Sequence, residues 1–271
     1  GLSSIETLHG DDPHILKEEE KNKYFRAKLQ MEENMMENKS LPIHTRVSTG
    51  VKGLDALIGG GLIPGRVYVV TGPPGSGKTT LGIQFLVEGA KNGEKGVYIS
   101  LVDDPKTIIQ DMLYYRFNLL SHIRSKRIVI YDLGAVLTRG SKKPTWAEIL
   151  EEIKSIILHE NAKRVVIDSF TPLEFMVQDP ENKRKEVVRL IKLLSTMEIT
   201  AIIITEMMES EKYTDDYYVA SGVIMMHHFM RQYNMIRALQ ILKMRGTSHD
   251  SNLKKIKITE NGIEVYNEAP W

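Results

Sequence analysis

The sequence predicts an α/β fold in which a mostly parallel central sheet carries helices on both of its faces. Two observations support this prediction. Short apolar runs rich in Val and Ile recur along the chain, as expected for strands that are buried on both faces of a parallel sheet. Between these runs lie segments whose apolar residues repeat at helical spacing, which is the alternation of a βαβ chain.

Length and composition restrict the class of protein. The 271 residues suffice for one large domain, or for a domain with an extension. A formal net charge of +1 gives no bias toward nucleic acids or acidic membranes. No apolar run is long enough to cross a membrane, the first twenty residues lack the apolar core of a signal peptide, and cysteine is absent. We therefore expect a cytoplasmic protein without disulfides and without membrane contact.

Residues 1–45 are predicted to be an N-terminal extension, and residues 46–271 a single domain. The extension is rich in charge, and its apolar residues between positions 16 and 36 would give a helix a loose apolar stripe. Two interpretations remain open. The helix could pack on the protein's own core, or it could be an arm that docks on a neighbouring subunit.

A glycine-rich segment follows the first predicted strand, residues 66–71. It matches G-x-x-x-x-G-K-[ST], the phosphate-binding loop or Walker A motif, and consists of Gly72, Pro73, Pro74, Gly75, Ser76, Gly77, Lys78 and Thr79. The glycines allow a tight turn whose N–H groups point at phosphate oxygens. Lys78 adds a charge for the β- and γ-phosphates, and the Thr79 hydroxyl suits Mg²⁺. Thr80 begins the helix whose N-terminus faces the anion, and the segment as a whole predicts nucleotide binding.

The second predicted strand, residues 96–101, is followed by two adjacent acidic residues. A carboxylate at the carboxyl end of a strand next to the phosphate-binding loop can orient an attacking water molecule. Asp103 is the candidate for that role, and an equally acceptable interpretation is that it only starts a turn. For Asp104 we favour a cap on the predicted helix that contains residues 108–112.

The middle of the chain continues the alternation of strands and helices. Strand 126–132 is followed by a predicted polar loop at 134–144 and a helix at 146–157. Strand 164–169 contains Asp168 near its end, the Walker B pattern, and we expect this carboxylate to hold Mg²⁺ through water. A helix at 187–194, a strand at 200–206 and a polar loop at 207–218 are predicted next.

The last part of the chain contains a predicted strand within residues 237–249. Alternation around Lys243 and Arg245 puts both cations on one face of that strand, which on sequence alone is compatible with a salt-bridged edge. Residues 256–266 are predicted to close the domain as a β-hairpin.

Two segments resemble the KaiC-like branch of the RecA-superfamily ATPases. The first is residues 49–65, which read T-G-x-x-G-L-D and then G-G-G and P-G shortly before the phosphate-binding loop. The second is Lys-Met-Arg-Gly-Thr-Ser-His at 243–249. The resemblance covers about residues 46–266. It implies a RecA-like fold with a C-terminal β-hairpin, and ATP with Mg²⁺ bound between the subunits of a homo-oligomeric ring, expected to be a hexamer.

The resemblance also assigns roles to individual residues. In that family the equivalents of Lys243 and Arg245 reach the γ-phosphate of the neighbouring subunit. It implies that Arg237, Thr247 and His249 are supporting contacts in the same shared site. The family usually carries two glutamates where this chain has Val102 and Asp103. The change at Val102 implies that hydrolysis could be slow.

Three functions remain open at this point. The first is a P-loop ATPase with Lys78, Asp103, Lys243 and Arg245 as catalytic candidates. The second is a nucleotide-dependent assembly or signalling switch with little or no hydrolysis. The third is a binder of single-stranded DNA, for which the sequence offers only scattered basic residues, so nucleic acid is not an expected partner. A further protein partner is expected, and the sequence does not identify it.

Overall fold

The structure is a computed structural model that describes residues 22–23, 25–30, 45–140, 142–174, 179–207 and 219–271. The chain divides into two compact units, Gly1–His44 and Thr45–Trp271. In the first unit the described residues, 22–23 and 25–30, are helical and exposed. The remainder of the predicted extension and most of the predicted loop at 207–218 lie outside the described residues. No described helix is long and apolar enough to cross a membrane.

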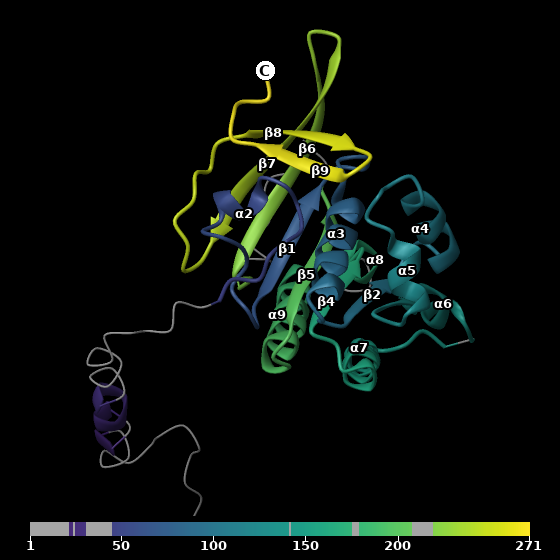
Figure 1. Cartoon of the computed structure of the whole chain (residues 1–271). Coiled ribbons are helices and arrows are strands. Elements are labelled where there is room, and N and C mark those ends of the chain that lie inside the picture. Colours follow the sequence, from purple (N-terminus) through teal and green to yellow (C-terminus); the bar gives the residue numbers. More distant parts are fainter. Residues whose placement is uncertain (1–21, 24, 31–44, 141, 175–178, 208–218) are drawn as a thin grey trace, which may run out of the picture. The chain divides into compact units, whose positions relative to one another are not determined.

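The second unit is built on a nine-stranded sheet (Figure 1) with the strand order β3-β2-β4-β5-β1-β6-β7-β8-β9. The strands are β1 (Val67–Gly72), β2 (Gly96–Ser100), β3 (Ile128–Asp132), β4 (Arg164–Asp168), β5 (Thr200–Glu206), β6 (Gly222–Arg231), β7 (Asn234–Met244), β8 (Lys254–Thr259) and β9 (Gly262–Tyr266). Neighbours from β3 to β6 are parallel, and neighbours from β6 to β9 are antiparallel. The predicted fold class, including the C-terminal hairpin, is confirmed.

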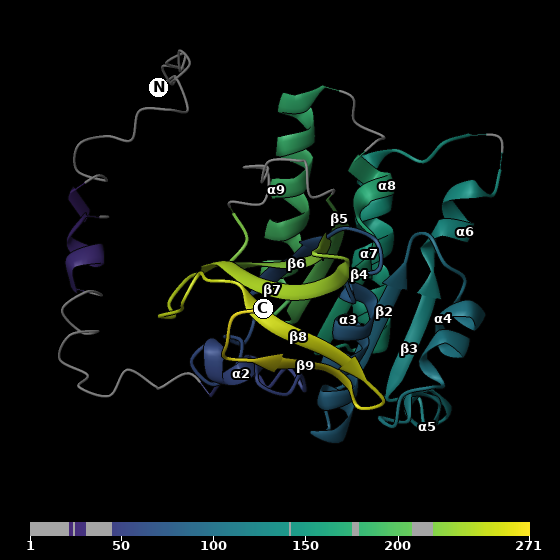
Figure 2. The same cartoon turned by 90° about the horizontal axis from the view of Figure 1, so that it is seen from above.

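Helices cover both faces of the parallel part of the sheet (Figure 2). They are α2 (Leu54–Leu57), α3 (Lys78–Lys91), α4 (Pro105–Met112), α5 (Leu119–Arg124), α6 (Leu133–Thr138), α7 (Trp146–Glu160), α8 (Thr171–Glu174) and α9 (Pro180–Thr196). One apolar core joins α2, α3, α4 and α5 to the sheet, and a second joins α6, α7 and α9 to its other face. Successive side chains of β1 point to opposite faces of the sheet and so contribute to both cores. Tyr68 and Val70 pack in the first core, and Val67 and Val69 pack in the second.

The prediction of a loop at 134–144 is wrong for its first half, where the structure has the helix α6. The side chain of Asp132 accepts a hydrogen bond of 2.8 Å from the N–H of Ala135, which is the geometry of a helix N-cap. Leu133 is buried in the second core and fixes the first turn of the helix. A cap and one apolar anchor are too short a signal to reveal a six-residue helix from periodicity.

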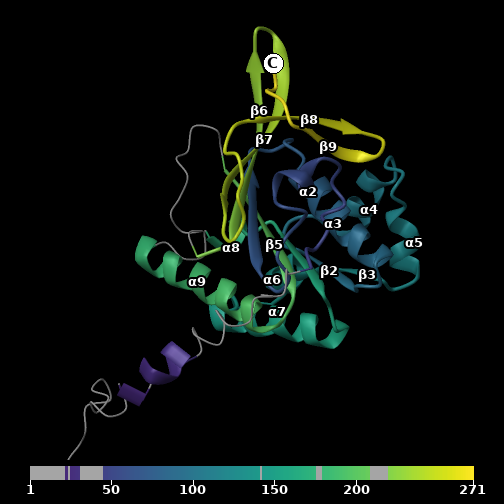
Figure 3. The same cartoon turned by 60° about the vertical axis from the view of Figure 1, so that its left-hand side comes forward.

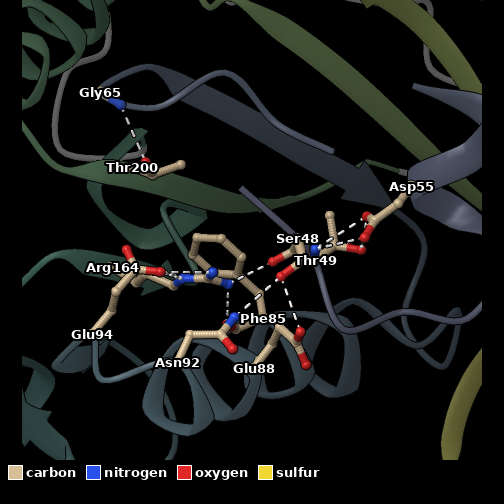
Figure 4. Close-up of polar contacts among 10 residues, drawn as sticks. All are labelled: Ser48, Thr49, Asp55, Gly65, Phe85, Glu88, Asn92, Glu94, Arg164 and Thr200. Carbon is tan, nitrogen blue, oxygen red and sulfur yellow. Dashed lines mark hydrogen bonds and ion pairs between the residues drawn. The ribbon is translucent and has the colours of Figure 1, made fainter. Parts of the chain in front are cut away.

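A buried arginine joins three segments at the amino edge of the sheet (Figure 4). Arg164, only 1% exposed, donates hydrogen bonds to the carbonyl oxygens of Ser48 at 2.7 Å and Phe85 at 2.9 Å. Its guanidinium lies 4.8 Å from the centre of the Phe85 ring and forms an ion pair of 3.0 Å with Glu94. The chain entry, the middle of α3 and the start of β4 are therefore held by one side chain.

We predict that Arg164→Met lowers the free energy of unfolding by about 3 kcal/mol, because two buried carbonyls lose their donor and Glu94 loses its partner. Glu94→Gln should cost about 1 kcal/mol, since the Glu94 side chain is 34% exposed. Urea unfolding of the purified variants measures both values. Lys185→Gln, which removes an exposed ion pair with Glu181, is the matched control and should change little. Equal costs for the Arg164 and Lys185 variants would contradict the structural role of Arg164.

Candidate nucleotide site

The phosphate-binding loop connects the carboxyl end of β1 to the first turn of α3. A Cβ on Gly72 would lie 2.2 Å from the carbonyl oxygen of Met226, so only glycine allows this approach of β6 to the loop. Gly77 precedes the helix with φ at +101°, a conformation that L side chains rarely adopt. The loop is therefore fixed by its backbone, and the helix N-terminus opens toward it.

Two polar side chains of the loop are arranged for an anion. The ammonium group of Lys78, a buried residue, donates a hydrogen bond of 2.8 Å to the carbonyl of Pro73 and so folds back over the loop. The buried Ser76 hydroxyl makes no hydrogen bond within the part of the chain that the structure describes. A buried polar group of this kind is costly unless a ligand or water satisfies it. Both observations fit a bound phosphate chain.

Thr79 and Asp168 meet beside the loop. The Thr79 hydroxyl donates a hydrogen bond of 2.7 Å to a carboxylate oxygen of Asp168, and the phenol of Tyr98 in β2 donates to the same oxygen. β2 and β4 are parallel neighbours, with Ser100 paired to Asp168, so the register places the phenol under the carboxylate. Sequence reasoning missed Tyr98, because a tyrosine inside an apolar strand looks like an ordinary core residue.

The electrostatics of the site follow from burial. Burial raises the pKa of Asp168, while the hydrogen bonds from Tyr98 and Thr79 and the charge of Lys78 oppose that rise. Burial lowers the pKa of Lys78, and the charges of Glu206 and Asp168 oppose that change. Burial together with the carboxylate of Asp168 holds the pKa of Tyr98 well above its usual range, so the phenol remains a donor.

A cleft of about 360 Å³ lies against the phosphate-binding loop. Its lining includes Val102 and Asp103 after β2, Asp168 at the end of β4, and Glu206 at the end of β5. Sequence reasoning did not assign Glu206. Its position follows from the strand order, because Glu206 pairs with Gly72 across the parallel β5–β1 ladder, which puts the end of β5 beside the loop.

The two aspartates after β2 have different positions. Asp104 caps α4, since its side chain accepts a hydrogen bond of 2.8 Å from the N–H of Thr107, and the predicted cap is confirmed. Asp103 lines the cleft, and its carbonyl oxygen accepts a hydrogen bond from the Ser100 hydroxyl.

The phosphate-binding loop forms another part of the cleft. The Pro73 carbonyl accepts the hydrogen bond from Lys78. The loop and the start of α3 also contribute lining residues, namely Pro74, Gly75, Gly77, Thr79 and Thr80.

The five basic, hydroxyl and imidazole side chains implied by the family resemblance fall into two groups. Arg237 lies at its own phosphate-binding loop and donates a hydrogen bond of 3.0 Å from Nε to the carbonyl of Gly75. Thr247 accepts a hydrogen bond of 2.8 Å from Arg46, and the His249 ring lies 3.4 Å from the Thr247 carbonyl. Thr247 and His249 therefore lie together near the chain entry, on the side of Lys243 and Arg245.

Strand register places Lys243 and Arg245 far from the loop of the same chain. Lys243 pairs with Val223, and the N–H of Arg245 donates to the carbonyl of Ser221, whose own N–H donates to Val67 at the start of β1. The phosphate-binding loop begins at the other end of β1, roughly 16 Å away at about 3.3 Å per residue. Burial lowers the pKa of Lys243, and the neighbouring charge of Arg245 lowers it further.

The donors at the loop also suit a magnesium ion. Thr79 and Asp168 offer a hydroxyl and a carboxylate oxygen, the hard ligands that Mg²⁺ prefers beside substrate phosphates. Among the described residues no group of three or more His, Asp or Glu could form a metal cage. One hydroxyl and one carboxylate are the protein ligands expected for an ion that is shared with the phosphates of a nucleotide.

Fold and site together define the class of protein. A phosphate-binding loop after a central parallel strand, with an acidic residue at the end of β4, is the arrangement of a RecA-type P-loop nucleoside triphosphatase. Residues 47–270 match the family described as "ATPase: KaiC". The chain belongs to this family, whose members bind ATP.

Relatives and solved structures agree with this assignment. The solved structure of a KaiC-like protein from the hyperthermophilic archaeon Pyrococcus horikoshii has a TM-score of 0.71 and 30% sequence identity, over 82% of this chain and 98% of that chain. A UPF0273 protein of Thermotoga maritima is 29% identical over 82% of this chain and 96% of its own length. The circadian clock oscillator protein KaiC of Picosynechococcus is 29% identical over 82% of this chain, which spans only 44% of that relative.

We predict that Tyr98→Phe raises the Mg²⁺ concentration needed for half-maximal nucleotide binding by roughly tenfold, as expected for a residue that orients a metal ligand. Loss of the phenol removes a hydrogen bond that lowers the pKa of Asp168, so that pKa rises further. The defect should grow as the pH falls, because a protonated carboxyl group does not bind the ion. Mg²⁺ titrations of a fluorescent ATP analogue at alkaline and mildly acidic pH measure this effect.

Tyr131→Phe is the control for this experiment. Its phenol donates a hydrogen bond of 2.6 Å to Glu160, a tyrosine–carboxylate contact away from the cleft. If both variants bound Mg²⁺ and nucleotide as the wild type does, the role of Tyr98 as a positioning residue would be wrong.

Proposed function

We propose that the protein is an ATPase whose active sites form between the subunits of a homo-oligomeric ring. The observation that carries this proposal is the separation of Lys243 and Arg245 from the phosphate-binding loop of their own chain. The two cations lie at the amino edge of the parallel strands, whereas the cleft lies at the carboxyl edge. A head-to-tail arrangement of copies brings these two edges together and closes into a ring when the rotation permits.

The residues of the cleft support hydrolysis of the terminal phosphate. The loop N–H groups and Lys78 bind the phosphate chain, and Thr79 and Asp168 would hold Mg²⁺, which supplies charge neutralisation at the phosphate oxygens when it is bound. We assign to Asp103 the orientation of the attacking water, with Glu206 as a second carboxylate that lines the cleft. Lys243 and Arg245 of the adjacent copy would stabilise the charge on the transferred group, with Thr247 and His249 beside them.

We place Arg237 in a different role within the same site. Because its Nε atom donates to the Gly75 carbonyl, its guanidinium stands beside the loop of its own chain. It would thus support the nucleotide in cis, while the other four side chains act from the neighbouring copy.

We predict that Arg245→Ala abolishes turnover and leaves ATP binding close to that of the wild type, because an arginine acting in trans contributes roughly 10³–10⁵ in rate. Mixing this variant with Lys78→Ala tests the shared site. Neither variant has a complete site alone, but mixed rings place an intact loop against an intact arginine. Random assembly of equal amounts should restore roughly a quarter of the wild-type rate. A mixture that stays inactive, although it assembles, would place Arg245 outside a shared site.

A second candidate function is a nucleotide-dependent assembly switch with little or no hydrolysis. Val102 favours it, because this exposed apolar side chain lines the cleft at a position where the family usually carries an acid. Binding energy alone could then drive oligomer formation, since a ligand that binds only the assembled state stabilises that state.

Hydrolysis per subunit, measured against protein concentration with Lys78→Ala as the blank, separates the two functions. For the ATPase we expect a specific rate that rises with concentration and that Asp103→Asn reduces by at least about tenfold. Glu206→Gln is the comparison, and a larger loss in this variant would transfer the water-orienting role to Glu206. ATP binding and assembly without turnover above the blank would favour the switch.

A further inference from the structure

The outer part of the β6–β7 hairpin projects beyond the rest of the sheet (Figure 3). The pairing of β6 with β1 ends at Met225, whereas the pairing of β6 with β7 continues to Arg231 opposite Asn234. β8 pairs with β7 only at Ala238 and Leu239. Beyond these positions the described strands form a two-stranded ribbon that rises past the level of the phosphate-binding loop.

One face of this ribbon contacts the chain's own C-terminal segment. The guanidinium carbon of Arg231 lies 4.0 Å from the centre of the Trp271 ring. On the same face, the His227 ring lies 3.2 Å from the side-chain oxygen of Gln240, which lines a cavity with Trp271 and the neighbouring residues. This face therefore contacts the C-terminal segment, although Arg231 and Trp271 remain exposed to solvent.

The opposite face carries three successive cross-strand pairs, and their surroundings change along the ribbon. The pair Met226 and Leu239 is buried in the core, and the next pair, His228 and Arg237, borders Gly75 of the phosphate-binding loop. The outermost pair is Met230 and Met235, which are 69% and 54% exposed. The loop-facing side of the ribbon thus ends in an apolar pair, one same-face position beyond the pair that borders the loop.

We propose that a second copy of this chain covers the methionine pair Met230 and Met235 when the ring assembles. The inference rests on the proposed function, because that function requires the amino edge of a neighbour to reach the phosphate-binding loop. The face of the pair continues from His228 and Arg237, which border that loop, so the approaching neighbour must pass along it. Exposure of two apolar thioether side chains to water is unfavourable, and methionine is enriched in the buried centres of protein interfaces.

Tyr233 is a further exposed apolar side chain, at the tip of the ribbon. It is 99% exposed and lies in the turn between β6 and β7, with a positive φ of 66°. Methionine and tyrosine are enriched at interfaces between proteins, and the tyrosine ring offers a large area for burial there. A large exposed aromatic residue at the tip therefore fits contact with the neighbouring copy better than contact with solvent.

The test removes the apolar pair without opening the hairpin. The double variant Met230→Lys, Met235→Glu places opposite charges directly across the two strands, which preserves their pairing. Mass photometry or sedimentation with ATP and Mg²⁺ then measures the oligomer over a range of protein concentrations. Leu158→Lys is the matched control, because Leu158 is a similarly exposed apolar residue (62%) on α7.

We expect the double variant to need roughly tenfold more protein than the wild type for half-maximal assembly. The Leu158 control should assemble as the wild type does. A double variant that assembles at the wild-type concentration would overturn the inference, and the proposed function would stand. A wild type that never assembles with nucleotide would instead remove the proposed function itself.

A fluorescent label distinguishes a second copy from other occupants of the surface. The chain contains no cysteine, so Met235→Cys can be labelled at a single site with an environment-sensitive dye. We expect its emission to shift to the blue as the protein is concentrated with nucleotide, and a label on Leu158→Cys to change much less. A shift on addition of ATP to dilute, monomeric protein would instead identify the nucleotide base as the occupant and overturn the proposal. No shift on assembly would also overturn it.

Discussion

The parallel pairing of β1 with both β5 and β6 is the constraint on which the rest of the structure depends. Pairing on both sides buries β1 completely and aligns the ends of β4 and β5 with the start of the phosphate-binding loop. Asp168 and Glu206 therefore line the cleft because of where their strands end. The same pairing, transmitted through β6 to β7, fixes Lys243 and Arg245 at the opposite edge. One set of ladder hydrogen bonds therefore separates the two halves of the proposed site.

Burial sets the chemistry of the cleft. Asp168 is surrounded by apolar strands, which raises its pKa, and two hydroxyl donors and Lys78 keep its charged form accessible. Lys78 experiences the reverse effect, because desolvation lowers its pKa while Glu206 and Asp168 oppose the change. A cationic loop and an anionic strand end therefore stabilise each other before any nucleotide arrives. Mg²⁺ and phosphates that bind there exchange existing charge contacts for stronger ones.

Much of the fold and part of the site could be predicted from the sequence, because these features depend on local patterns. Apolar β-branched runs identified the strands β1 to β5, and the G-x-x-x-x-G-K-[ST] pattern located the phosphate-binding loop. The cap by Asp104 was also local. Tyr98, Glu206 and the contact of Arg237 with Gly75 could not be derived in this way, since each depends on which strands are neighbours. The short helix α6 escaped prediction because its signal is a single cap and one buried leucine.

The position of Arg46 has a mechanical consequence. Its guanidinium donates to the Thr247 hydroxyl at 2.8 Å, and the next residue, Val47, exchanges two backbone hydrogen bonds with Leu62. Thr247 follows Arg245 by two residues, in the turn that ends β7. A force that pulls on the chain at residue 45 therefore reaches both the Val47–Leu62 bridge and, through the Arg46 side chain, the segment that follows Lys243 and Arg245. This hydrogen bond couples the entry of the domain to its cationic edge.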